Sequence, residues 1–317
     1  MSRRFTFVMA TRNRADYLER VLVNVRQYVG PDDEFILVDG ASTDGTLEVI
    51  ARNRDVITDY ISEKDTSEPH ALNKGILRAR GRYIKLLTDD DHTFPGAIER
   101  AAAVLAAHPE IDALQCGGEH FRRSPEGAEE FKYHAWFPPG AAWKDDVWNA
   151  IRYKVACGLG LFFAPRIVAQ VGLLDTSYAA MDTEFILRLL AHRIDYRFLS
   201  VMLYRHITYP HSIIANQERA RRDRIRLVLR LLTWDPAAPQ HFPLKELASR
   251  LGMSDLDLEK LLFFLRREAR RDDRSWQRVA KPVLSGGKAM WELLERVRDS
   301  AEPELERPVP VWDGSLR

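Results

Sequence analysis

The chain has 317 residues, of which 45% are hydrophobic and 29% charged, so it is long enough for one large globular domain or two smaller ones. Its 47 Lys and Arg residues are balanced by 46 Asp and Glu residues, a formal net charge of +1 that argues against nucleic acid as a partner. The two cysteines fall outside any CxxC spacing, which argues against a disulfide framework or a zinc site and fits a reducing compartment.

The sequence shows no sign of export or of a membrane span. Its N-terminus passes directly into a strand-like segment, without the apolar core of a signal peptide. No segment approaches the roughly 18 consecutive apolar residues that a spanning helix requires. We therefore expect a cytoplasmic protein, with membrane contact limited to the inner surface.

Strand-like and helix-like segments alternate over about the first 115 residues. The apolar, strand-forming segments are residues 5–9, 34–38, 56–61, 83–87 and 111–116. Asn13 is the expected N-cap of the first helix, and Pro95 is expected to open the helix after the fourth strand. This alternation predicts an α/β fold, with a mostly parallel, Rossmann-like sheet flanked by helices on both faces.

The alternation ends at residue 117, and residues 117–157 are expected to be rich in loops. Aromatic side chains in this segment either pack in a core or form a platform for a bound molecule. The pattern then predicts a strand, turn and short helix over 158–175, an amphipathic helix over 181–193 and a strand over 196–205. We predict a first domain over 1–215, with halves at 1–116 and 117–215.

A helical C-terminal region is predicted over 216–302, followed by a loosely ordered tail over 303–317. The helix expected over 219–232 carries an apolar stripe flanked by arginines, which is typical of a packed helix or of one lying on an anionic membrane. Part of this region resembles a helix-turn-helix, but no single helix concentrates basic charge. A helical cap or a homodimer element is therefore favoured over DNA binding.

Three consecutive carboxylates, Asp89, Asp90 and Asp91, follow the fourth predicted strand. Like charges at a strand end repel one another unless a cation lies among them, and Mg²⁺ or Mn²⁺ binds carboxylates together with phosphate oxygens. A solvated turn, or a cap for the helix that opens at Pro95, is the structural alternative. Polar segments also follow the first three strands, and ligands of such sheets bind at the carboxyl ends. Because no GxGxxG or GxxxxGK[ST] loop is present, we expect any diphosphate to be bound through a metal.

Over roughly residues 4–212 the sequence resembles the family 2 glycosyltransferases of the GT-A fold. Members of this family are inverting enzymes that use a nucleotide-diphosphate sugar and a divalent metal. The resemblance is carried by five motifs in the family's order: FVMATRNRADYLERVL, FILVDGASTDGT, SEKDTSEPHALNKGI, ARGRYIKLLTDDD and MDTEFILRLL. It implies that residues 1–116 bind the nucleotide sugar and that residues 117–215 bind the acceptor.

The resemblance also implies roles for individual residues. Asp182 is the implied general base, and Asp89 is the residue implied to meet the ribose. The other implied nucleotide-binding residues are Thr11, Arg12, Asn13, Asp39 and Ser42. Among these, Asp39 is implied to contact the nucleobase. The implied metal ligands are Asp90, Asp91 and His206, and the residues implied to contact the donor sugar are Glu63, Asp65, Asn73 and Lys74.

Some of these assignments have alternatives or depart from the family pattern. His206 can also be a packed or solvated histidine, and Asn73 and Lys74 can also cap a helix. Met181 stands where the family usually has Glu, which leaves Glu184 as a second candidate for the base. Gly40 stands where many members carry a second Asp.

The implied function is metal-dependent, inverting transfer of a sugar from a nucleotide-diphosphate donor, with UDP favoured. The acceptor is expected to be a hydroxyl of a glycan or of a lipid-linked molecule in cell-surface polysaccharide synthesis. A sugar-nucleotide pyrophosphorylase would open with a Gly-rich loop, which is absent here. A catalytically silent nucleotide-sugar or glycan-binding module is the remaining alternative, although it would not need both Asp90 and Asp182.

Overall fold

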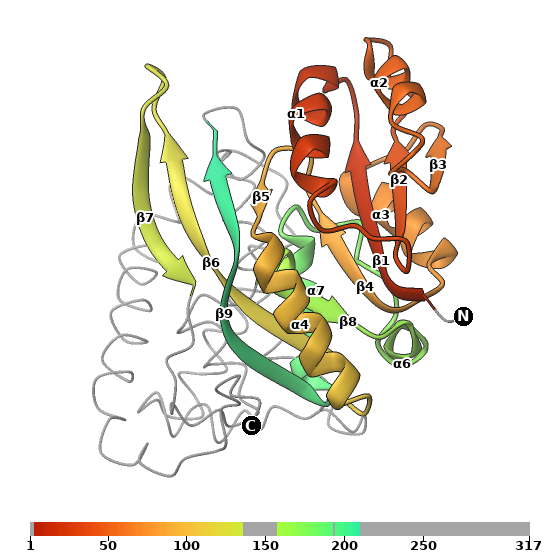
Figure 1. Cartoon of the computed structure of the whole chain (residues 1–317), viewed down its shortest axis with the longest axis vertical. Helices are drawn as coiled ribbons and strands as arrows, with labels where there is room; N and C mark the ends of the chain where they lie inside the picture. Colours follow the sequence, from red (N-terminus) through yellow and green to blue (C-terminus); the bar gives the residue numbers. More distant parts are fainter. Residues whose placement is uncertain (1–2, 136–156, 193, 210–317) are drawn as a thin grey trace, which may run out of the picture. The chain divides into compact units, whose positions relative to one another are not determined.

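The computed structural model describes residues 3–135, 157–192 and 194–209 (Figure 1). The helical region predicted over 216–302 and the tail over 303–317 lie outside these ranges, so their predicted roles in a dimer or at a membrane remain predictions, as does the domain boundary at 215. Trp136, Phe137, Trp143 and Trp148 of the aromatic segment also lie outside the described residues. In the described ranges no helix combines the length and apolarity needed to cross a bilayer.

The first half of the fold is the predicted alternation of strands and helices. Its strands are β1 (Arg3–Thr11), β2 (Glu34–Asp39), β3 (Asp59–Ser62) and β4 (Gly81–Leu87), and its helices are α1 (Ala15–Val25), α2 (Thr46–Arg52) and α3 (Glu68–Arg78). β1 pairs in parallel with both β2 and β4, and β2 pairs in parallel with β3. The carboxyl ends of these four strands therefore lie along the same edge of the sheet.

The second half continues the same sheet with mixed strand directions. It contains β5 (His92–Thr93), α4 (Pro95–Ala107), β6 (Ala113–Arg123), β7 (Glu129–Ala135), β8 (Leu161–Phe163), α6 (Val168–Val171), α7 (Met181–Ala191) and β9 (Tyr196–Thr208), with 3₁₀ turns η1 (Gly158–Gly160) and η2 (Pro165–Ile167). The strand order is β3-β2-β1-β4-β8-β6-β9-β5, with β7 beside β6. β8 is antiparallel to both β4 and β6, whereas β6 and β9 are parallel. The sheet is thus parallel in its first half and mixed in its second.

The expectation of a loop-rich segment after residue 116 is wrong for its first part. β6 continues to Arg123, and the chain then turns back as β7, antiparallel to β6. Figure 1 shows these two strands as a long hairpin beside β9. Two other predictions are confirmed: Pro95 opens α4, and α7 begins at Met181.

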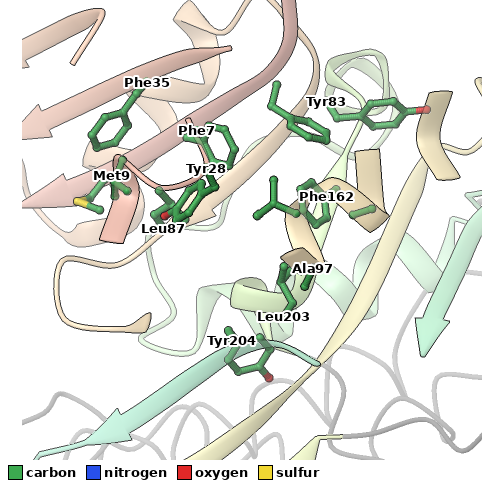
Figure 2. Packing of buried hydrophobic residues seen from close by; sticks show 14 of the residues in the cluster. Phe7, Met9, Tyr28, Phe35, Tyr83, Leu87, Ala97, Phe162, Leu203 and Tyr204 are labelled. Carbon is green, nitrogen blue, oxygen red and sulfur yellow. The ribbon is translucent and has the colours of Figure 1, made fainter. Parts of the chain in front are cut away.

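The core is divided by the sheet because successive side chains of a strand point to opposite faces. Phe7 of β1 and Phe35 of β2 pack on the face that is covered by α1, α2 and α4. Ile36 and Val38 of β2 pack on the other face with Ala71 of α3. Figure 2 shows how the larger cluster extends from Phe7 and Phe35 to Leu203 and Tyr204 of β9.

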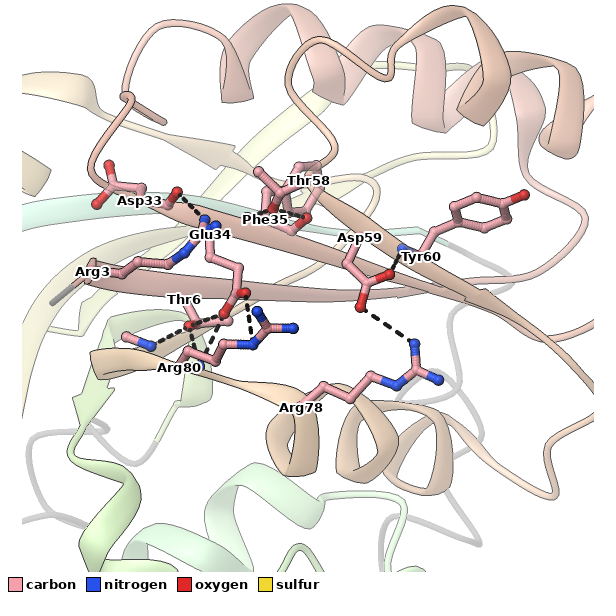
Figure 3. A network of polar contacts seen from close by, with 11 residues as sticks. Arg3, Thr6, Asp33, Glu34, Phe35, Thr58, Asp59, Tyr60, Arg78 and Arg80 are labelled. Carbon is pink, nitrogen blue, oxygen red and sulfur yellow. Dashed lines mark hydrogen bonds and ion pairs between the residues drawn. The ribbon is translucent and has the colours of Figure 1, made fainter. Parts of the chain in front are cut away.

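A buried polar network joins β1, β2 and β4 near their amino ends (Figure 3). Thr6 Oγ1 donates to Glu34 Oε2 at 2.7 Å and accepts from the Gly81 amide at 2.8 Å. The Arg80 amide donates to the same Glu34 oxygen at 3.0 Å. These bonds fix the three strands at the edge opposite to the predicted site, which lies where the strands end.

Candidate active site

The segments that follow β1 and β4 are joined by hydrogen bonds and ion pairs. Thr11 Oγ1 donates to Asp89 Oδ2 at 2.7 Å. Arg14 bridges two carboxylates, with Nε 2.9 Å from Asp89 Oδ1 and Nη2 2.6 Å from Asp90 Oδ2. The Arg14 guanidinium also lies 3.9 Å from the centre of the Tyr17 ring, a cation–π contact that restricts its position. An arginine that the sequence analysis did not select is therefore the counter-ion of two predicted site residues.

Asp91 joins the end of β4 to β9. Its carboxylate accepts from Thr88 Oγ1 at 2.6 Å and from the Ile207 amide at 3.1 Å, and it lies 3.0 Å from His206 Nδ1. Burial lowers the pKa of His206, but the hydrogen bond that its imidazole donates to Asp91 and the charges of Asp91, Asp90 and Asp182 outweigh it, so the pKa is raised. Two predicted metal ligands, Asp91 and His206, are thus in direct contact.

Two of the carboxylates after β4, those of Asp89 and Asp90, have raised pKa values. Burial raises the pKa of Asp89 to about 6, although Arg14 and Thr11 favour its charged form. Burial, followed by repulsion from Asp91, raises the pKa of Asp90, against the attraction of Arg14 and His206. The buried surroundings of Asp89 and Asp90 therefore disfavour their charged forms more than the nearby cations favour them.

Glu68, the first residue of α3, is a further acid that the sequence analysis missed. Its surface is exposed, yet the pKa of Glu68 is raised to about 7, first by desolvation among densely packed neighbours and then by the charges of Asp182, Asp89, Asp90 and Asp91. An acid in the first turn of a helix is common because it complements the helix dipole, so Glu68 has no distinctive signal in the sequence. Because the charges of Asp182 and of the three carboxylates after β4 all affect Glu68, these four carboxylates lie around one region.

The residue types at this region fit a hard divalent cation. Asp90, Asp91 and His206 provide oxygen and imidazole ligands of the kind that Mn²⁺ and Mg²⁺ accept, and the excess of carboxylates favours a cation. Among the described residues, however, no set of three or more His, Cys, Asp or Glu side chains is arranged to hold a metal. Arg14 and His206 already engage Asp90 and Asp91, so ion binding requires these contacts to rearrange.

The predicted nucleotide residues after β1 and β2 form one connected group. Asp39 is fully buried and accepts from the Ser42 amide at 3.1 Å, from Ser62 Oγ at 2.6 Å and from Ser42 Oγ. The Asn13 amide donates to Ser42 Oγ at 2.8 Å. The carboxylate of Asp39 is therefore held by serines, and its contact with the nucleobase of a donor stays a prediction.

The prediction that Asn13 caps the first helix is wrong. α1 begins at Ala15, and Asn13 adopts a left-handed backbone conformation with φ of 53°. Its side-chain oxygen accepts instead from the Thr43 amide at 2.8 Å. The first helical amide, that of Ala15, donates to Asp44 Oδ2 at 3.1 Å, so the loop after β2 caps α1 across space.

Two predicted site residues lie close to Gly40, the position where the family pattern often has a second Asp. A Cβ atom at this position would lie 2.5 Å from Asp65 Oδ2 and 3.0 Å from Arg12 Cδ. The side chains of Asp65 and Arg12, two of the predicted site residues, therefore both lie next to Gly40, where a Cβ atom would project. The room for a second carboxylate at position 40 is taken by the side chain of Asp65.

The other predicted donor-sugar residues have structural partners. Asn73 of α3 donates from Nδ2 to the Leu174 carbonyl at 2.9 Å and accepts from the Leu174 amide at 3.0 Å, which fastens α3 to the segment before α7. Lys74 lies 3.0 Å from Glu63 and donates to the Lys64 carbonyl at 3.1 Å. Direct contact of Glu63, Asn73 or Lys74 with a sugar stays a prediction.

The two candidate bases in α7 have different surroundings. Asp182 accepts from the Gly158 amide at 2.9 Å through Oδ2 and from the Thr183 amide at 2.7 Å through Oδ1. Glu184 is buried and forms a bidentate ion pair with Arg188, at 2.7 and 3.0 Å. The carboxylate of Glu184 is paired with an internal cation, whereas that of Asp182 accepts from neutral donors: the two amides and, at 3.5 Å, the Thr183 hydroxyl.

Comparison with known sequences identifies relatives of this chain. The model of glycosyl transferase family 2 matches residues 6–154. A PGL/p-HBAD biosynthesis glycosyltransferase of Mycobacterium tuberculosis is 30% identical over 189 residues, covering 58% of this chain and 68% of that protein. The succinoglycan biosynthesis protein ExoO of Rhizobium meliloti is 30% identical over 128 residues, covering 38% of this chain but only 37% of that protein. The match thus spans well under half the length of ExoO.

Solved structures share the fold at low sequence identity. TarS residues 1–349 of S. aureus, in complex with UDP-GlcNAc, match with a TM-score of 0.58 and 16% identity, covering 73% of this chain and 67% of that one. The mannosyltransferase PcManGT of Pyrobaculum calidifontis, in complex with GDP-Man and Mn²⁺, matches with a TM-score of 0.56 and 18% identity, covering 95% and 86%. The predicted GT-A fold is therefore confirmed.

Proposed function

Because this chain belongs to glycosyl transferase family 2, we propose that it transfers a sugar, with inversion, from a nucleotide-diphosphate donor to an acceptor hydroxyl. The observation that carries the proposal is the group of three carboxylates at the end of β4, in which Asp89 and Asp90 contact Arg14 and Asp91 contacts His206. The acceptor is a glycan or lipid-linked molecule in cell-surface polysaccharide synthesis, by analogy with ExoO, a protein of succinoglycan biosynthesis.

The donor binds at the carboxyl ends of β1, β2 and β4. Thr11, Asn13, Asp39 and Ser42 surround the nucleoside in this proposal, and Asp89 meets the ribose. Their support is the pair of hydrogen-bonded groups at these strand ends, one joining Thr11 to Asp89 and the other joining Asn13, Ser42 and Asp39. UDP is favoured as the nucleotide by the similar TarS structure with UDP-GlcNAc, while PcManGT with GDP-Man makes GDP the competing choice.

Asp182 is the general base. It removes the proton from the acceptor hydroxyl, the oxygen forms a bond to the anomeric carbon, and the bond from that carbon to the diphosphate oxygen breaks on the opposite face. The hydrogen bond from the Gly158 amide orients the carboxylate for this task. Asp90, Asp91 and His206 would hold Mn²⁺ or Mg²⁺, which when bound neutralises charge on the leaving diphosphate.

The test measures binding and turnover separately. UDP, GDP and dTDP are titrated calorimetrically into the full-length protein with and without Mn²⁺, and release of the nucleotide from its sugar conjugates is followed over a panel of glycan acceptors. Asp90→Ala should abolish metal-dependent nucleotide binding. Asp182→Asn should bind nucleotide normally but lower kcat by about 10² to 10⁴, the usual contribution of a general base.

Asp59→Ala is the matched control, because Asp59 pairs with Arg78 at the start of β3, the end of the strand opposite to the site. It should leave both measurements unchanged. Nucleotide binding without turnover on any acceptor would favour a catalytically silent binding module. Absence of binding by all three nucleotides would remove the proposal altogether.

A further inference from the structure

Lys85 is a fully buried cation in the middle of β4. Its ammonium group donates to the Leu86 carbonyl at 2.8 Å and to the Leu159 carbonyl at 2.6 Å, and it lies 5.8 Å from the centre of the Phe162 ring. Within the described ranges no carboxylate forms an ion pair with it. Burial lowers the pKa of Lys85 to about 8. Because burying an unpaired ammonium is costly, an apolar residue would serve the core better if packing were the only requirement.

The second partner of Lys85 belongs to the 3₁₀ turn η1. Lys85 holds this turn at the Leu159 carbonyl, and Gln115 of β6 holds it at the Cys157 carbonyl through Nε2, at 3.2 Å. Gln115 in turn accepts from the hydroxyl of Tyr196 at 2.8 Å. A Cβ atom on Gly160 would lie 2.1 Å from Gln115 Nε2, so the turn is packed directly against the side chain of Gln115.

The same turn carries the amide that orients Asp182. Gly158 donates its backbone N–H to Asp182 Oδ2 at 2.9 Å, and a Cβ atom on Gly158 would lie 2.9 Å from Asp182 Cβ. The turn and the first residues of α7 are therefore in tight contact. A shift of η1 by a fraction of an ångström would move or break the hydrogen bond to Asp182.

We propose that Lys85 is a positioning residue for the transfer reaction: by holding the Leu159 carbonyl it fixes η1, so that the Gly158 amide orients the carboxylate of Asp182. This inference rests on the proposed function, in which Asp182 is the general base. Lys85 touches neither donor nor acceptor in this scheme. It acts from the core through one carbonyl and one amide.

Lys85→Met tests the proposal because methionine fills a similar volume without the ammonium. We expect kcat to fall about 10- to 100-fold, as for a small misplacement of a catalytic group, with the donor KM and the affinity for UDP unchanged. Amide hydrogen exchange over residues 157–160 should become faster, while exchange in α1 stays the same. Tyr83→Phe is the matched control, because it removes another side-chain bond from β4 to a backbone carbonyl, that of Ile111 at 2.9 Å.

A double-mutant cycle separates this inference from the proposed function. In an Asp182→Asn background, Lys85→Met should cause no further loss of kcat, since the group that it positions is already absent. If Asp182→Asn itself keeps full activity, the assignment of the base fails. If Asp182→Asn is inactive but Lys85→Met retains wild-type kcat, or alters UDP affinity as strongly as kcat, the role of Lys85 is overturned. Gln115→Met perturbs the same turn and replaces Lys85→Met if that variant does not fold.

Discussion

At the scale of single residues, Asp182 and Glu184 lie in one helical turn but perform different tasks. Glu184 and Arg188 form a buried ion pair, and Arg188 also donates to the Leu173 carbonyl at 2.8 Å. We expect Glu184→Gln to lower the free energy of unfolding by about 3 to 5 kcal/mol, because it leaves a buried guanidinium uncompensated. Urea denaturation measures this effect. Asp182→Asn is the control and should lose much less stability, and equal losses would contradict the division of roles.

The buried ammonium of Lys85 makes a second prediction at this scale. Its pKa is lowered from 10.5 to about 8 in the folded protein, so between these values the unfolded chain binds more protons than the folded one. The contribution of Lys85 to the free energy of unfolding therefore increases as pH rises from 8 towards 10, by at most about 1.4 kcal/mol per pH unit. Unfolding free energies of wild type and Lys85→Met should differ by an amount that changes with pH in this sense. A difference independent of pH would show that burial does not lower the pKa of Lys85.

At the scale of elements, close packing of α3 on β1 depends on Gly75. A Cβ atom there would lie 2.3 Å from Val8 Cγ1 and 3.4 Å from Val38 Cγ2. Although alanine favours helix formation over glycine, we expect Gly75→Ala to destabilise the protein by about 1 to 3 kcal/mol through overpacking. Gly96 of α4 has no atom within 4 Å of the same position. Gly96→Ala should therefore be neutral or stabilising, and thermal unfolding of both variants tests the contrast.

The elements predicted from sequence were those whose apolar residues signal burial. β2 is buried at every position, and its apolar run was recognised. β7 is exposed at most positions and β6 ends in alternating polar residues, so a search for apolar runs missed this hairpin. The acidic candidates for the site could be selected because they directly follow strands or occupy motifs of the family, and their roles stay predictions. Arg14, Glu68 and Lys85 were missed because their roles depend on distances between segments far apart in the sequence.

At the scale of the whole molecule, the candidate site exists only because the sheet brings distant strand ends together. Arg14 follows β1, Asp89 and Asp90 follow β4, and His206 lies in β9. Arg14 forms ion pairs with both Asp89 and Asp90. An ion that binds alone must displace the guanidinium, whereas a diphosphate offers Arg14 new anionic partners. The affinities for the ion and for the nucleotide should therefore be coupled.

We expect UDP to tighten Mn²⁺ binding by about 5- to 150-fold, and Mn²⁺ to tighten UDP binding by the same factor, because such coupling is reciprocal. Titration of free Mn²⁺, monitored by electron paramagnetic resonance with and without UDP, measures the first factor, and calorimetry measures the second. Arg14→Met removes the internal competitor, so this variant should bind Mn²⁺ alone more tightly than the wild type and show weaker coupling. Equal Mn²⁺ affinity with and without UDP in the wild type would mean that the arginine contacts do not oppose the ion. In that case the carboxylates after β4 would bind the ion without first releasing Arg14, contrary to the prediction.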